Sequence, residues 1–297
     1  MELVTIFPVR MRGRLKGFLK RNDLEEIRVR IGQAIEMICA KESFFLDADG
    51  QEGRVTIEDI GEMLNYISQY SLYAYRDKIR QGFVTVEGGH RIGLCGSAVM
   101  EHGEVAGISP VSFLNIRIAH EKCGCAEELL PWVCHAYGIY HTLLISKPGI
   151  GKTTFLRDLI RLLSKNHLKI SVVDERCELA ACYRGIPQND LGPTTDVLEG
   201  CTKAAGMMLL LRVMSPDVIA VDELGKKEDF AAVEEACMSG CKILATLHAD
   251  NLTQVQKKPY LEKWVKQNLF ERYILLLRDE SGERRFQVFD GNLERLC

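Results

Sequence analysis

A glycine-rich loop at residues 146–154 combines the residue types that hold a polyphosphate. It reads Ser-Lys-Pro-Gly-Ile-Gly-Lys-Thr-Thr, with an apolar, strand-like segment (residues 142–145) before it and a helical pattern (residues 155–163) after it. A strand, a tight loop and a helix in this order form the context that a phosphate-binding P-loop requires. The alternative is a chance Gly-Lys-Thr at the start of a helix, and the presence of both flanking elements favours the P-loop.

The chemistry of this loop is local. The glycines have no Cβ, so the backbone can curl and aim successive N–H groups inward. These groups and the positive end of the following helix attract an anion. Lys152 can reach the β- and γ-phosphates of ATP, and the Thr153 hydroxyl can bind Mg²⁺. Ser146 stands where the motif has its first glycine. The predicted nucleotide-binding residues are Pro148, Gly149, Ile150, Gly151, Lys152, Thr153 and Thr154.

A first pair of acidic residues follows an apolar segment of the chain. Asp222 and Glu223 come directly after Val-Ile-Ala-Val at 218–221. An acid in this position holds Mg²⁺ directly or through water, as a Walker B residue does. Glu223 beside it can orient and deprotonate the attacking water. We therefore predict Thr153, Asp222 and Glu223 as the magnesium site and Glu223 as a catalytic residue. The structural alternative is an acidic pair that caps a strand and has no role in binding or catalysis.

Two further polar groups follow predicted strands. Asp174 and Glu175 come after the strand at 169–173, and His248 comes after the strand at 242–247. Either acid can serve as base or metal ligand, and the residues alone do not rank them. His248 can sense the γ-phosphate through a hydrogen bond, although a histidine after a strand is commonly structural. Arg176 can simply pair with one of the acids.

The order of elements after residue 121 predicts an α/β fold. A helix is expected over 127–137, before the strand that leads into the loop. Beyond the loop, strands and helices alternate, and the strands are nearly continuous apolar runs, which indicates a mainly parallel sheet flanked by helices. Ligands of such sheets bind beyond the carboxyl ends of the strands. All the polar groups above lie at strand ends, so they converge on one edge. We assign residues 122–297 to a RecA-like P-loop ATPase domain.

Residues 1–121 predict a smaller α+β domain. Strands are expected within 24–39, in a hairpin over 83–94 and at 112–118. A helix is expected at 57–67, with Thr56 as its N-cap, and continuing over 71–75. Hydrolysis needs a positive charge opposite the γ-phosphate, often from a neighbouring subunit. This domain offers Arg91 and Arg117, whereas the nucleotide domain offers Arg176, Arg184 and Arg212.

Composition limits the possible partners and the compartment. The net charge is −3 over 297 residues, so no overall basic field draws the chain to nucleic acid. Residues 1–30 lack an apolar signal region, and no run of about 18 apolar residues occurs. We therefore expect a reducing cytosol with free thiols. Basic residues within 1–22 could touch anionic lipid, although a solvated helix face is the simpler interpretation. The cysteine and histidine spacing matches no metal-ligand pattern.

Several motifs resemble those of secretion and pilus traffic ATPases. The stretch 215–223 is similar to their Walker B region, 174–178 to their acidic box, and 240–248 to their histidine box. The resemblance places the closing acid on Glu223 and the second histidine on His248, whereas Cys241 replaces the first. The acidic pair at 174–175 is in swapped order. The resemblance also implies that catalytic arginines come from the N-terminal domain, with Arg117 ahead of Arg91.

A narrower resemblance covers nearly the whole chain. The stretches 24–30, 82–96, 173–196 and 206–229 are similar to the stage III sporulation protein AA family. It implies a cytoplasmic ATPase in the mother cell, peripheral at the membrane if membrane-bound at all. Its implied partners are copies of itself in a ring, hexameric by analogy, and membrane proteins of a channel into the forespore. ATP and Mg²⁺ are the implied cofactors.

Departures from these patterns keep two other hypotheses open. Ser146 and Cys241 are compatible with a ring subunit in which bound ATP closes the ring but is rarely cleaved. The third hypothesis is an ATPase that acts on DNA or RNA, because RecA-like folds host those too. No basic stripe interleaved with aromatic residues occurs, which argues against nucleic acid.

Overall fold

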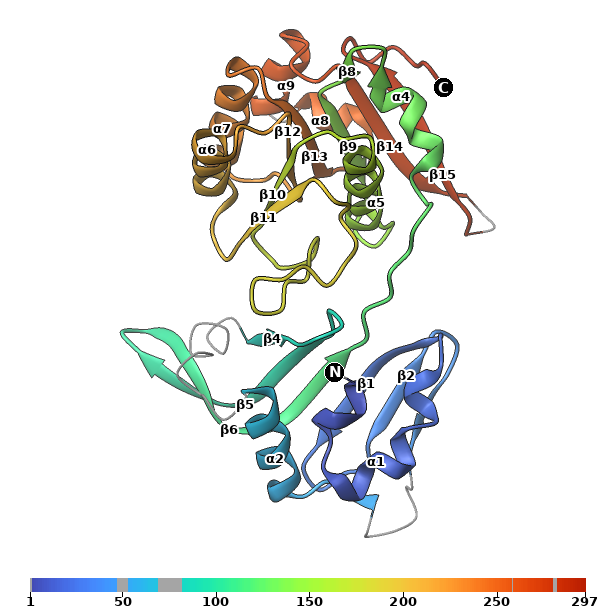
Figure 1. Cartoon of the computed structure of the whole chain (residues 1–297), viewed down its shortest axis with the longest axis vertical. Coiled ribbons are helices and arrows are strands. Elements are labelled where there is room, and N and C mark those ends of the chain that lie inside the picture. Colours follow the sequence, from blue (N-terminus) through green and yellow to red (C-terminus); the bar gives the residue numbers. More distant parts are fainter. Residues whose placement is uncertain (1, 47–52, 69–81, 258, 280–281) are drawn as a thin grey trace. The chain divides into compact units, whose positions relative to one another are not determined.

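The computed structural model describes residues 2–46, 53–68, 82–257, 259–279 and 282–297. The chain divides into two compact units, coloured along the sequence in Figure 1. The first contains Met1–His120 together with Ala181–Gln188, and the second contains Glu121–Ala180 with Asn189–Cys297. Two segments of the second unit thus flank a short excursion, Ala181–Gln188, that belongs to the first unit.

The first unit is built on a six-stranded antiparallel sheet with the order β3-β2-β1-β6-β5-β4. Its strands are β1 (Leu24–Arg30), β2 (Glu36–Cys39), β3 (Ser43–Phe45), β4 (Phe83–Thr85), β5 (Arg91–Glu101) and β6 (Glu104–Arg117). Its helices are η1 (Leu3–Ile6), α1 (Val9–Leu15), η2 (Phe18–Lys20) and α2 (Ile57–Ile67). The predicted continuation of the helix over 71–75 lies outside the described residues.

Helices α1 and α2 are joined to each other and to the sheet by one core. Residues of both helices share a buried cluster with alternate residues of β1, such as Ile27 and Val29. Helix α2 begins with a capping box, in which the Thr56 side chain accepts from the Asp59 N–H and Asp59 accepts from the Thr56 N–H. Asp59 also accepts a 2.7 Å hydrogen bond from Nε of Arg10 on α1. The predicted N-cap at Thr56 is confirmed.

The predicted strand at 112–118 is only the inner half of a longer strand. Strands β5 and β6 pair from Arg91↔Arg117 to Glu101↔Glu104, and their outer halves form an exposed ribbon seen in Figure 1. The pairing shifts beside Gly96, where an added Cβ would lie 2.1 Å from the Pro110 carbonyl oxygen. Because the ribbon is solvated on both sides, it lacks the alternation that reveals a half-buried strand.

The second unit contains a seven-stranded sheet with the order β11-β10-β12-β13-β9-β14-β15. All neighbours are parallel except β14 and β15, which form an antiparallel hairpin. The strands are β9 (Thr142–Ser146), β10 (Ile170–Asp174), β11 (Thr195–Glu199), β12 (Val218–Val221), β13 (Lys242–His248), β14 (Arg272–Arg278) and β15 (Arg284–Asp290). The sequence analysis did not identify β11, an edge strand with few apolar residues.

Helices cover both faces of this sheet. They are α5 (Lys152–Lys165), α6 (Lys203–Met214), α7 (Lys227–Met238), α8 (Leu252–Lys257) and α9 (Pro259–Lys266). One buried cluster joins α6, α7 and α9 to alternate residues of β9, such as Leu143 and Ile145. Helix α5 contacts β9 and β13 from the opposite face, as Figure 1 shows.

The segment that leads into β9 differs from the expected helix over 127–137. It forms η5 (Glu127–Leu129) and α4 (Leu130–Val133), followed by a short hairpin of β7 (Cys134–His135) and β8 (Gly138–Ile139). The helix ends early because the chain turns back, and the Tyr140 N–H donates to the Val133 carbonyl at 2.9 Å. Of the described helices, none is both long and apolar enough to cross a bilayer.

Candidate functional site

The glycine-rich loop connects the central strand β9 to the start of α5. All five residues of β9 are buried, so the strand provides a rigid base for the loop. Gly149 and Gly151 have φ angles of 79° and 110°, in the left-handed region that residues with a Cβ rarely adopt. Helix α5 begins at Lys152 immediately after this turn. The backbone conformation of the loop therefore favours glycine at both positions.

Lys152 is buried beneath the loop with three polar neighbours. Its Nζ lies 3.3 Å from the Ser146 carbonyl oxygen, 3.3 Å from Ser146 Oγ and 2.8 Å from His248 Nδ1. Burial lowers the pKa of Lys152, although the charges of Asp222 and Glu223 oppose the shift. Ser146, the departure from the glycine pattern, is thus a direct partner of the lysine in the ligand-free site.

Asp222 is held by two threonine hydroxyls. Thr153 Oγ1 donates to Oδ2 at 2.6 Å, and Thr246 Oγ1 donates to Oδ1 at 2.5 Å. Burial raises the pKa of Asp222, and these two hydrogen bonds act in the opposite direction. The structure thus brings together Thr153 and Asp222, two of the predicted magnesium ligands. The sequence analysis missed Thr246 as a site residue, and its only signal was its place near the end of β13.

Glu223 has a partner at each of its carboxylate oxygens. Its Oε1 lies 2.8 Å from His248 Nε2, and its Oε2 lies 2.5 Å from Nη1 of Arg176. Burial alone would raise the pKa of Glu223, but the His248 hydrogen bond and the charge of Arg176 lower it overall. Its φ of 55° is in the left-handed region, a conformation that costs roughly 1–3 kcal/mol for such a residue and clusters at functional sites.

The second acidic pair divides into two different environments. Asp174 is buried and accepts the N–H groups of Glu178 and Ala180, each at 2.8 Å. Burial raises the pKa of Asp174 despite these hydrogen bonds. Both of its oxygens therefore anchor the loop that follows β10.

Glu175 instead pairs with two lysines. It forms an ion pair with Lys203, the buried first residue of α6, and a 3.3 Å ion pair with Lys226. Burial raises the pKa of Glu175, but the hydrogen bond and charge of Lys203 outweigh this effect and lower it. Neither lysine was predicted as a site residue, because no motif in the sequence links positions so far apart.

The predicted arginines belong to the first unit. Arg91 and Arg117 face each other on β5 and β6. The Arg91 guanidinium carbon lies 4.0 Å from the centre of the Phe83 ring, and Arg117 Nε lies 3.4 Å from a Glu26 oxygen. The loop, the acids and His248 all lie in the second unit. The structure therefore groups the candidates into two sets, one in each unit.

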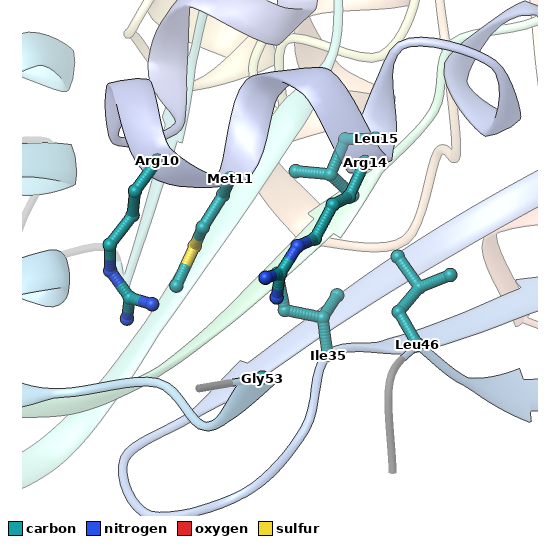
Figure 2. A pocket seen from close by; sticks show the side chains of 7 residues that line it. All are labelled: Arg10, Met11, Arg14, Leu15, Ile35, Leu46 and Gly53. Carbon is teal, nitrogen blue, oxygen red and sulfur yellow. The ribbon is translucent and has the colours of Figure 1, made fainter. Parts of the chain in front are cut away.

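A small pocket of the first unit offers no comparable chemistry. Figure 2 shows its lining, which consists of Arg10, Met11, Arg14, Leu15, Ile35, Leu46 and Gly53. Its free volume is about 20 Å³, room for about one water molecule but not for a nucleotide. Within the described ranges, no three His, Cys, Asp or Glu side chains are grouped so that they could hold a metal ion.

Comparisons with known proteins agree with this architecture. The family model described as "Sporulation stage III, protein AA" matches residues 2–296. Stage III sporulation protein AA of Bacillus subtilis (strain 168) is 38% identical over 301 residues, covering 98% of this chain and 96% of that protein. Among shorter matches, the type IV pilus assembly ATPase PilB of Acinetobacter baylyi is 31% identical over 38% of this chain and 18% of its own length.

Solved structures with the same fold cover both units. The pilus retraction motor PilT with bound ADP has a TM-score of 0.64 at 16% identity, over 97% of this chain and 82% of its own. The ATPase DotB of Legionella pneumophila has a TM-score of 0.61 at 15% identity, over 96% and 81%. These likenesses confirm the predicted fold class, a RecA-like α/β unit preceded by a small α+β unit.

Proposed function

The chain belongs to the stage III sporulation protein AA family, and from this premise we propose that it is an ATP-hydrolysing, secretion-type ATPase. It forms a ring, hexameric by analogy with traffic ATPases, in the mother-cell cytoplasm. It powers the assembly or operation of the channel between mother cell and forespore, together with membrane proteins of that channel. No nucleic acid takes part.

The observation that carries this proposal is the convergence of Lys152, Thr153, Asp222, Glu223 and His248 at one edge of the sheet. These residues come from two neighbouring strand ends, those of β12 and β13, and from the start of helix α5. Hydrogen bonds of 2.6–2.8 Å join them in pairs. A structural role alone would not require a buried lysine, a held aspartate and an ionised glutamate around a glycine-rich loop.

Each residue has a defined task toward ATP. The N–H groups of 149–154 surround the phosphates, and Lys152 neutralises charge on the β- and γ-phosphates. Thr153 and Asp222, which share a hydrogen bond, are the residues that would hold Mg²⁺. Both offer side-chain oxygens, the ligand atoms that this ion prefers. When bound, the ion neutralises charge that develops on the phosphate oxygens.

Glu223 is the base that we assign. Its lowered pKa keeps it ionised near neutral pH, so it can accept a proton from the attacking water. The water oxygen then bonds to the γ-phosphorus, and the bond from that phosphorus to the β–γ bridging oxygen breaks. ADP leaves with the bonding electrons, and phosphate is released. His248 and Arg176 orient the carboxylate meanwhile.

Ring formation supplies the remaining positive charge in this proposal. Arg117, with Arg91 beside it, approaches the γ-phosphate of a neighbouring subunit. The support for this assignment is the exposure of the Arg117 side chain, 65%, and its place in a unit separate from the loop.

Purified protein tests the enzymatic proposal directly. Wild-type protein should bind ATP and release phosphate, whereas Lys152→Ala should lose both abilities. Glu223→Gln should retain binding but lose hydrolysis. Phosphate release by wild-type protein at the rate of Lys152→Ala, despite ATP binding, would rule out the motor.

One observation favours the second candidate function, an ATP-binding ring subunit with little hydrolysis. Cys241 replaces the first histidine of the histidine box and is buried, with Sγ 3.5 Å from the Lys242 carbonyl. Cys241 directly precedes β13, so it lies at the opposite end of this strand from His248 and the glycine-rich loop, and this position provides no polar contact to a nucleotide in the loop. Single-turnover assays separate the two: a ring subunit of this kind would bind ATP and keep it intact over many minutes.

A further inference from the structure

The C-terminal hairpin brings a cation to the phosphate loop. An added Cβ on Gly151 would lie 3.0 Å from Nη2 and 3.3 Å from Cζ of Arg284, the first residue of β15. The same Cζ lies 5.6 Å from the centre of the Phe155 ring, in the first turns of α5. The guanidinium therefore lies against the loop backbone at Gly151, where a Cβ would crowd it.

The electrostatics of this position are unfavourable without an anion. Gly151 is the N-cap of α5, a helix of 14 residues, and a helix N-terminus repels cations. Lys152 adds a second positive charge at the adjacent position. Among the described residues, no carboxylate forms an ion pair with Arg284, and the Phe155 ring is its one aromatic neighbour. An anion in the loop would convert this repulsion into attraction.

The topology indicates which part of a nucleotide lies near Arg284. Asp222, Glu223 and His248 follow β12 and β13, on one side of β9 in the sheet. Arg284 lies on β15, two strands away on the other side of β9. A polyphosphate in the loop, with its γ-phosphate next to Glu223, would direct its nucleoside end toward Arg284.

We infer that Arg284 binds the α-phosphate end of the nucleotide within the same subunit, opposite Lys152. This inference rests on the proposed function, because it requires nucleotide in the loop. The contact is the same for ATP and ADP, which share the α-phosphate. It therefore contributes uniform binding, which changes affinity rather than the rate of the chemical step.

The neighbouring residue provides a matched control. Arg285 has the same side chain on the same strand, but it pairs with Asp279 and Glu283, each at 3.1 Å. Arg284→Ala should raise the dissociation constants of ADP and ATP by a similar factor, about 10-fold or more, the loss expected for a charge-assisted contact. Arg285→Ala should change them less than about 2-fold, as expected for an exposed pair.

Melting temperatures measured with and without ADP distinguish a loss of nucleotide binding from a loss of folding. Since Arg284 is repelled in the ligand-free site, Arg284→Ala should melt at or above the wild-type temperature without ADP but gain less stability when ADP is added. Arg284→Lys should recover part of the ADP effect. Equal ADP affinity of Arg284→Ala and wild type would overturn this inference and leave the proposed function intact. No ADP or ATP binding by wild type would overturn both.

Discussion

His248 Nε2 and Glu223 Oε1 lie 2.8 Å apart, although the residues are on different strand ends. The other ring nitrogen of His248 lies 2.8 Å from Lys152 Nζ. One imidazole therefore connects the candidate base to the candidate phosphate-binding cation. These contacts occupy groups that ATP would need, so we expect nucleotide binding to release Lys152 from His248.

Removal of the charge on Glu223 should separate binding from chemistry. We expect Glu223→Gln to lower the hydrolysis rate by about 10²–10⁴, the usual contribution of a general base, and to change ATP affinity little. Because the folded-state pKa of Glu223 is lowered, wild-type activity should not fall through protonation of this acid until the pH is below about 4.5, the ordinary value for glutamate. Phosphate release measured from pH 5 to 8 checks this, and a loss centred near pH 6 that Glu223→Gln abolishes would contradict it.

The ion pair of Glu175 and Lys203 should stabilise the second unit in a pH-dependent way. We expect Lys203→Met to lower the free energy of unfolding by about 1–2 kcal/mol, less than for a fully buried pair because Glu175 is partly exposed. The pKa of Glu175 is lowered in the folded state, so its contribution is present above about pH 4.5 and is lost as the pH falls through the folded pKa.

Urea unfolding at pH 7 and pH 3.5 measures this difference. The destabilisation caused by Glu175→Gln should shrink at the lower pH. Lys169→Met is a suitable control, because Lys169 pairs only at 4.0 Å with the exposed Asp217. An equal effect of Glu175→Gln at both pH values would argue against the ion pair.

The capping box of α2 should contribute to the stability of the first unit. Thr56→Ala removes the acceptor for the Asp59 N–H and should cost about 0.5–2 kcal/mol. Asp59→Asn should cost more, because it also removes the charge that pairs with Arg10. Urea midpoints monitored by circular dichroism test both. The exposed Thr253 of α8 provides a control, and no difference between Thr56→Ala and Thr253→Ala would refute the capping role.

Sharing of the site between subunits predicts complementation. Arg117→Ala should lose about 10³-fold or more in hydrolysis, the usual contribution of an arginine finger, while ATP binding is preserved. Mixing it with Lys152→Ala protein should restore part of the activity, since each supplies what the other lacks. Arg28 provides the control substitution. It lies on β1, the strand next to β6, and pairs with Glu26 of the same strand.

Two results would count against a shared site. The first is an absence of recovered activity in the mixture, and the second is a monomer mass in solution both with and without ATP. Hydrolysis by a strict monomer would place the arginine requirement within the second unit, where Arg176 already contacts Glu223.

Local patterns in the sequence predicted the elements with short-range causes. A glycine-rich loop between a strand and a helix was predicted because its glycines, lysine and threonine are contiguous, and the cap at Thr56 because its partner is three residues away. The parallel strands were recognised as apolar runs. The helix over 127–137 was overestimated, because a tertiary turn at 134–139 ended it. The ribbon of β5 and β6 was missed in part, because its exposed half has no hydrophobic period.

The sequence by itself determined which residue types lie at the carboxyl edge of the sheet, since parallel strands place all their carboxyl ends at one edge. Only the tertiary structure decided which of these residues contact one another. Lys203 reaches Glu175 across 28 residues, and Arg284 reaches Gly151 from the last hairpin of the chain. Such contacts depend on the order of strands in the sheet, and strand order is set by packing between distant segments, which no local pattern records.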